Sequence, residues 1–202
     1  HWAFNFDTFT GETKELSPFD STCRPSPVFV SPSEFVAFGC HGGDNPQVLG
    51  GFNMRGEEMW EQGLFGDYTA PYLVFSPASG RFALGRIMSD MPFAENQAIV
   101  AGAVSAQNVV VYQTETGKQI LKLECSPVEP AGQNFALSTD GLSFGIVRAN
   151  AIEIYSLPPL SKKEQAAVKL AESAAPAVTE LPVRFTSSSE ARPATEDPTV
   201  QS

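Results

Sequence analysis

The sequence is poor in the residues that catalytic and metal sites use. Its 202 residues include two histidines and three cysteines, and only 18% are Asp, Glu, Lys or Arg, against about 25% in typical soluble domains. It contains neither the glycine loop of phosphate-binding proteins nor a Cys-x-x-Cys pair, the motifs of nucleotide and thiol redox sites. We therefore expect no catalytic residue, no metal site and no cofactor within this chain.

Long apolar runs and excess positive charge are also lacking. No stretch of 18 apolar residues occurs, so no membrane-spanning helix is predicted. The net charge is −10, and residues 1–160 hold 17 Asp and Glu against 8 Lys and Arg. Nucleic-acid binding needs a basic patch, so this acidic body argues against a nucleic-acid partner.

The cysteines and the start of the chain bear on its location. Cys23, Cys40 and Cys125 have no metal-binding spacing, and we expect buried free thiols; a Cys23–Cys40 bridge requires two neighbouring loops to hold both residues together. The sequence begins at His1 without a Met or a signal peptide. We expect an N-terminal part, with any targeting signal, to precede it, and the low lysine content is compatible with export to the periplasm or the exterior.

What the sequence does contain is a repeat. One signal is an apolar strand ending in Ser-Pro or Ser-Thr, a turn and a second apolar strand, and its copies are 28–39, 73–85 and 135–145. The other is a hairpin with glycine in its turn, and its copies are 4–12, 51–57 and 111–118, with a copy at 152–157 that lacks the turn. Ser31 to Ser76 is 45 residues, as is Gly11 to Gly56, so the two hairpins alternate in register.

The turns have a chemical basis, and together with the period they predict an architecture. Gly80, Gly117 and Gly141 supply the positive φ that tight hairpins need. Two alternating hairpins give four antiparallel strands, a to d, per period of about 45 residues, which is the period of a β-propeller blade. The longer second interval, 62 residues from Ser76 to Ser138, predicts an insertion at 87–107.

The third blade resembles a known repeat. Residues 75–85, Phe-Ser-Pro-Ala-Ser-Gly-Arg-Phe-Ala-Leu-Gly, followed by Val-Val-Val-Tyr-Gln-Thr-Glu-Thr-Gly-Lys-Gln-Ile-Leu at 109–121, are similar to the WD40-like repeat of bacterial β-propeller proteins. The resemblance extends over about residues 2–157. Gly56-Glu-Glu-Met-Trp60 is alternatively similar to quinoprotein-type blades. In the second blade, Phe52-Asn53 replaces the Trp-Asp of the family.

The expected fold is therefore all-β, an incomplete ring of four-stranded blades within residues 1–160. The predicted parts are a c–d hairpin at 2–16, blades at 26–63 and 72–124, and an incomplete blade at 133–157. Closed propellers need at least four blades, so we expect this chain to be the C-terminal part of a ring of roughly six to eight blades.

After the blades, a short helix and a disordered tail are expected. Ser161 and Glu164 form a capping box that predicts a helix at 161–175. Residues 176–202 are rich in Pro, Ser, Thr, Ala and Glu and are predicted to be disordered. Their one apolar stretch, 181–185, is interpreted as linker, with docking as the alternative.

In a propeller the a–b and c–d turns share one face, and the longer b–c and d–a loops share the other, where ligands bind most often. The loops of this second face are predicted at 40–48, 63–71, 86–108, 125–133 and 148–151. They supply the candidate ligand-binding residues, which are His41, Asp44, Asn45, Asp67, Tyr68, Asp90, Met91 and Glu95.

The predicted function is a non-enzymatic propeller scaffold that binds a protein or peptide through the b–c and d–a loop face, alongside the N-terminal blades expected to precede it. The alternative is a propeller enzyme or cofactor binder, quinoprotein-like, with its key residues in those preceding blades. A purely structural segment of a larger assembly is the third possibility.

Overall fold

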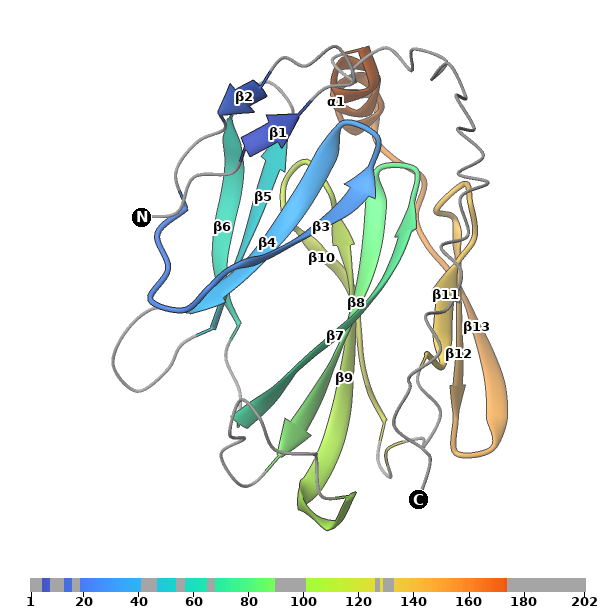
Figure 1. Ribbon diagram of the computed structural model, residues 1–202. Helices are drawn as coiled ribbons and strands as arrows, with labels where there is room; N and C mark the ends of the chain where they lie inside the picture. The colour runs from blue at the N-terminus through green and yellow to red at the C-terminus, as the bar shows by residue number, and fades with distance from the viewer. Residues whose placement is uncertain are drawn as a thin grey trace, which may run out of the picture.

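A computed structural model describes residues 5–7, 13–15, 19–40, 47–53, 57–64, 68–89, 101–125, 128 and 133–173. These residues form antiparallel sheets and one short helix (Figure 1), so the all-β prediction is confirmed. The predicted tail at 176–202 lies outside the described residues.

The first sheet is a four-stranded meander in the order β3-β4-β5-β6. Its strands are β3 (Ser26–Ser31), β4 (Glu34–Cys40), β5 (Gln47–Asn53) and β6 (Glu58–Leu64). Every residue of β4 from Glu34 to Gly39 is buried, and so is β5 from Val48 to Asn53, because both faces of this sheet are covered. Continuous apolar runs are the expected sequence of such strands.

The second sheet repeats this order as β7-β8-β9-β10. Its strands are β7 (Tyr68–Ala78), β8 (Arg81–Ser89), β9 (Val104–Gln113) and β10 (Gln119–Cys125). The 3-10 helix η1 (Ala101–Ala103) precedes β9. Because β8 continues to Ser89 and β9 begins at Val104, residues 87–89 and 104–107 of the predicted insertion belong to these strands.

The third sheet has three strands in the order β11-β12-β13. These are β11 (Phe135–Leu137), β12 (Ser143–Arg148) and β13 (Ala151–Ser156). Near the start of the chain, β1 (Asn5–Asp7) pairs with β2 (Thr13–Glu15) in a separate antiparallel hairpin.

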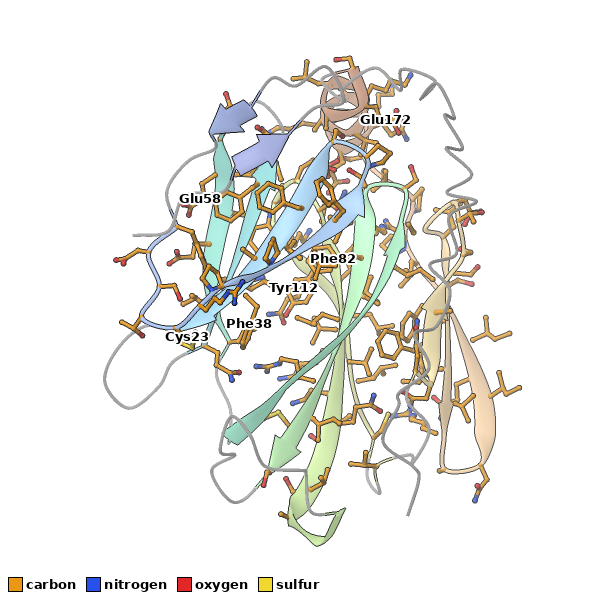
Figure 2. The ribbon with its side chains drawn as sticks, viewed as in Figure 1. Cys23, Phe38, Glu58, Phe82, Tyr112 and Glu172 are labelled. Carbon is orange, nitrogen blue, oxygen red and sulfur yellow. A yellow bond between two sulfur atoms is a disulfide. The ribbon has the colours of Figure 1, made fainter. Side chains whose placement is uncertain are left out.

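The three sheets pack in sequence order through two apolar layers. We call the side of a sheet that looks toward the following sheet its forward face, and the other side its backward face. Val36, Phe38 and Leu49 on the forward face of the first sheet are buried against Phe82, Leu84, Val110 and Tyr112 on the backward face of the second. Figure 2 labels Phe38, Phe82 and Tyr112 of this layer. Ala83, Val109 and Val111 on the forward face of the second are buried against Phe135, Phe144 and Ile146 of the third.

Trp60 ties the first sheet to the second. Its ring lies 6.3 Å from and nearly parallel to that of Phe82, and its indole Nε1–H donates to the carbonyl of Thr114 at 2.7 Å. The ring lies over Gly51 and Gly117, where an added Cβ would stand 2.3 and 2.6 Å from it. Gly117 also has φ +65°, so glycine is required there for conformation and for space.

A buried guanidinium ties the second sheet to the third. Arg81, at the start of β8, is 2% exposed and donates to the carbonyls of Gly141 and Pro158. Burial lowers the pKa of Arg81, but arginine remains charged in proteins. The two carbonyls belong to the β11–β12 turn and to the segment after β13, so Arg81 fixes the position of both.

The helix α1 (Lys162–Ser173) follows the third sheet. The predicted capping box is present, with the Ser161 amide donating to Glu164 Oε2 at 2.6 Å and the Glu164 amide donating to Ser161 Oγ at 3.2 Å. These bonds hold the pKa of Glu164 below its ordinary value. Val168 and Ala171 are buried, whereas Leu170 is 57% exposed.

The expectation of free thiols was wrong for two of the three cysteines. Cys23 and Cys40 form a disulfide with their Cα atoms 5.4 Å apart. The Thr22 amide and hydroxyl both donate to the Cys40 carbonyl, at 2.7 and 3.0 Å, which aligns the segment before β3 with the end of β4. Cys125 keeps its thiol and is buried in the layer between the second and third sheets.

Candidate functional site

Most of the predicted ligand-binding residues lie outside the described part of the chain. This applies to His41, Asp44, Asn45, Asp67, Asp90, Met91 and Glu95, so those predictions stand as they were made. The exception is Tyr68, which is the first residue of β7 and pairs with Ser89. It therefore belongs to a strand and not to the loop in which the sequence placed it.

One pentapeptide fits a catalytic motif, although we predicted that the chain contains no catalytic motif. Gly141-Leu-Ser-Phe-Gly145 fits Gly-x-Ser-x-Gly, which in α/β-hydrolases places a serine on a sharp turn between a strand and a helix. Here Ser143 instead begins β12 after a hairpin turn and pairs with Ser156. Its amide and carbonyl bond to Ser138 within that turn. The motif is therefore part of a β-hairpin and not a nucleophile site.

Within the described ranges, no group of three or more His, Cys, Asp or Glu side chains is arranged to hold a metal ion. No helix in that part of the chain combines the length and apolar character needed to cross a membrane.

The a–b and c–d turns lie at one end of the sheets, which we call the turn end, and α1 lies against it (Figure 1). Val168 of α1 lies over Gly80 of the β7–β8 turn, where an added Cβ would come within 2.6 Å of its Cγ2. Gly80 has φ +64°. The helix therefore sits directly on the turns of the sheets.

Two pockets, of about 400 and 440 Å³, lie at the turn end beside α1. The larger is acidic, and the described residues that line it are Glu34, Asn53, Glu57, Glu58, Met59, Glu115, Ala167, Leu170 and Ala171. Burial raises the pKa of Glu115, and the nearby carboxylates of Glu164 and Glu172 raise it further. The carboxylates disfavour the binding of an anion in this pocket. Residues of α1 form one of its walls.

The opposite end of the sheets carries the b–c and d–a connections, and we call it the loop end. Only its shortest connection is fully described, a two-residue turn at Ala149–Asn150 between β12 and β13. Both residues have positive φ, 49° and 61°, as in a type I′ hairpin. The helix α1 lies at the other end, so the loop end is the one that α1 leaves uncovered.

The forward face of the third sheet is apolar and exposed. Ile152 and Ile154 are 76% and 75% exposed, and Val147 is 40% exposed. The pairings Val147↔Ile152 and Gly145↔Ile154 place these residues on one face. In the first two sheets the corresponding face is buried by the next sheet. Exposed apolar patches of this kind mark interaction surfaces.

The backward face of the third sheet carries a polar group of three side chains, Arg148 from β12 and Glu153 and Tyr155 from β13. Arg148 Nε donates to Glu153 Oε1 at 2.8 Å, and the Tyr155 hydroxyl donates to the other Glu153 oxygen. Arg148 also donates to the Glu124 carbonyl of β10 at 3.0 Å. Arg148, more than Tyr155, lowers the pKa of Glu153. These bonds anchor β13 to the second sheet.

Reasoning from the sequence identified only part of this exposed face. The copy at 152–157 was identified as a strand without the following turn, but its exposure was not predicted. The alternation of Ile152 and Ile154 with Glu153 and Tyr155 identifies an apolar face of the strand, but it does not say what covers that face. Comparison of the chain with protein-family models, with curated proteins and with solved structures finds no match.

Proposed function

We propose that this chain is a non-enzymatic β-propeller scaffold, an arc of a ring of blades, that binds a protein or peptide through its loop end. The single observation that carries the choice of end is the position of α1. The helix lies over the turns, with Val168 on Gly80, and leaves the opposite end of the same sheets to a partner.

The propeller arrangement is supported by the way the sheets repeat. Two meanders of four strands and one of three follow each other in sequence order. Each forward face packs on the next backward face, with an aromatic residue at the same place in the second strand of each sheet, at Phe35, Phe82 and Phe144. Radially arranged blades pack in this way. Sheets of a sandwich instead pair one inner face with one other.

The exposed forward face of the third sheet fits an arc. In the proposed ring a further blade of the same protein packs on Ile152 and Ile154, as the second sheet packs on Phe38 and Leu49. Burying two isoleucine side chains contributes roughly 1.5–3 kcal/mol each, which favours closure of the ring.

The disulfide bears on where such a scaffold works. Disulfides persist in oxidising compartments and are rare in the cytosol. The Cys23–Cys40 bond therefore supports the proposal that the protein is exported.

The experiment compares the two ends by matched double substitutions in the full-length protein. Asp90→Ala/Met91→Ala changes the loop end, and Glu58→Ala/Met59→Ala removes the same kinds of side chain near the turn end, where both residues border the acidic pocket. Each protein is immobilised, exposed to extract of the source cells and cross-linked, and retained proteins are quantified by mass spectrometry.

We expect one protein to be retained by the unchanged protein and by the Glu58/Met59 variant, and to be reduced at least about tenfold, 1.4 kcal/mol, by the Asp90/Met91 variant. The proposal is overturned if the unchanged protein retains nothing, or if only the Glu58/Met59 variant loses the retained protein.

A further inference from the structure

Among the described residues, the third sheet has no counterpart of the fourth strand that completes the other two. In the first sheet the third strand, β5, pairs with a fourth, β6, and in the second sheet β9 pairs in the same way with β10. In the described part of the chain, the third strand of the third sheet, β13, is the last strand of its sheet. Its side chains Ile152 and Ile154 are the two most exposed large apolar residues described. An unpaired apolar edge is a template for strand addition.

The backbone groups that face this edge can be identified. The Leu157 amide donates to the Leu142 carbonyl at 2.8 Å, so Leu142–Leu157 is a hydrogen-bonded pair of the β12–β13 ladder. Such pairs alternate along antiparallel strands, which makes 144–155, 146–153 and 148–151 the others. The N–H and C=O groups of Ile152, Ile154 and Ser156 therefore point to the open edge.

The chain does not supply this strand directly after β13. In the second sheet, β9 is followed by a tight turn into β10. In the third sheet, β13 is instead followed by Leu157-Pro158-Pro159. The Pro158 carbonyl is held by Arg81, and the chain continues into α1. Prolines cannot donate to a ladder, so the fourth strand has to come from elsewhere.

We propose that Leu181–Thr186, which follows α1 and lies beyond the described residues, adds to the open edge of β13 as an antiparallel fourth strand. This assignment replaces the linker interpretation of the same stretch and does not depend on the proposed partner.

The side-chain pattern of the segment fixes its register. Leu181, Val183 and Phe185 alternate with Pro182, Arg184 and Thr186, as Leu121 and Leu123 of β10 alternate with Lys122 and Glu124. In β10 the apolar set packs toward the forward side and Lys122 is exposed. The equivalent orientation sets Val183 opposite Ile154 and Phe185 opposite Ile152, and it brings Arg184 opposite Glu153.

This register satisfies charge and backbone together. Arg184 is one of two basic residues in 174–202, and opposite charges directly across a ladder are stabilising. The backbone N–H and C=O groups of Ile152 and Ile154 point to the open edge, so Val183 and Phe185, which lie opposite them, would exchange hydrogen bonds with them. Pro182 then lies in a position whose N–H would point to solvent, where proline is tolerated on an edge strand.

The linker is long enough for the return. The 12-residue helix α1 is about 18 Å long at 1.5 Å per residue. Seven residues, 174–180, span at most about 25 Å. The chain can therefore run back along α1 and enter the edge beside Ser156.

The test is residue-resolved amide hydrogen exchange of the full chain by NMR. Val183→Pro removes the amide that would donate to β13, and Val200→Pro is the same substitution outside the proposed strand. Arg184→Glu places two carboxylates opposite each other, and Arg184→Lys keeps the positive charge.

We expect the amides of Ile152, Ile154 and Ser156 to be protected in the unchanged protein and in V200P and R184K. Their exchange should be at least about tenfold faster in V183P and R184E, with the β8–β9 amides unchanged in every variant. Unprotected amides in the unchanged protein, or equal rates in V183P and V200P, overturn the proposal. Unaltered rates in R184E overturn the register. Protection that rises with protein concentration and ignores V183P assigns the edge to a second copy and also overturns it.

Discussion

Trp60→Phe is expected to weaken the contact between the first and second sheets while preserving an aromatic ring at that position. The indole joins β6 to the β9–β10 turn through its hydrogen bond to Thr114 and its packing on Gly117. Phenylalanine retains the stacking on Phe82 but has no N–H, and its smaller ring leaves part of the space over Gly51 empty.

The magnitude follows from these two losses. A net hydrogen bond to a backbone carbonyl is worth about 1 kcal/mol, and the smaller ring removes apolar contact worth about 1–2 kcal/mol. Trp60 is half-buried, which favours the lower end of that range. We expect the free energy of unfolding to fall by about 2 kcal/mol.

The assay is urea unfolding followed by far-ultraviolet circular dichroism, since removing a tryptophan alters fluorescence. With a denaturant dependence of about 2 kcal/mol per M, the midpoint should fall by about 1 M. Lys169→Arg, at an exposed position of α1, is the control and should shift the midpoint little. A change below about 0.5 kcal/mol in Trp60→Phe, the range of ordinary surface substitutions, would refute the role given to the indole.

Three further predictions concern stability. Replacing Cys23 and Cys40 by serine should lower the free energy of unfolding by about 3 kcal/mol for a 17-residue separation, and dithiothreitol should then have no further effect on the unfolding midpoint; an equal effect of dithiothreitol on both proteins would contradict this. Because the pKa of Glu115 is raised in the folded state, its ionisation costs stability as pH rises through that pKa, so Glu115→Gln should be more stable than the unchanged protein at pH 7 but not at pH 4; a pH-independent difference in thermal midpoint would refute it. Gly80→Ala, at φ +64° and against Val168, should cost about 1–2 kcal/mol and release α1, seen as faster proteolysis at 162–173; unchanged proteolysis would count against the docking of α1.

Local sequence signals predicted the turns well. Gly80, Gly117 and Gly141 have φ between 64° and 67°, as the hairpin chemistry requires, and the capping box of Ser161 and Glu164 forms. These features depend on a few neighbouring residues, so the sequence alone determines them.

Features that depend on distant parts of the chain were not predicted. The burial of Arg81 follows from carbonyls 60 and 77 residues away, and the Cys23–Cys40 bond from the pairing of the segment before β3 with the end of β4. The strands β8 and β9 extend beyond their predicted ends because they pair with each other as far as Ser89 and Val104, where the residues give no periodic signal. The exposure of Ile152 could not be inferred, because alternation identifies a face but not what covers it.

The central claim is that the three sheets are consecutive blades of a larger ring. A cryo-electron-microscopy structure of the full-length protein tests it most directly. The account predicts the sheets arranged about one axis, with a further sheet packed on Ile152 and Ile154. A structure in which the third sheet closes back on the first, as a barrel or sandwich made by residues 1–160 alone, would contradict it.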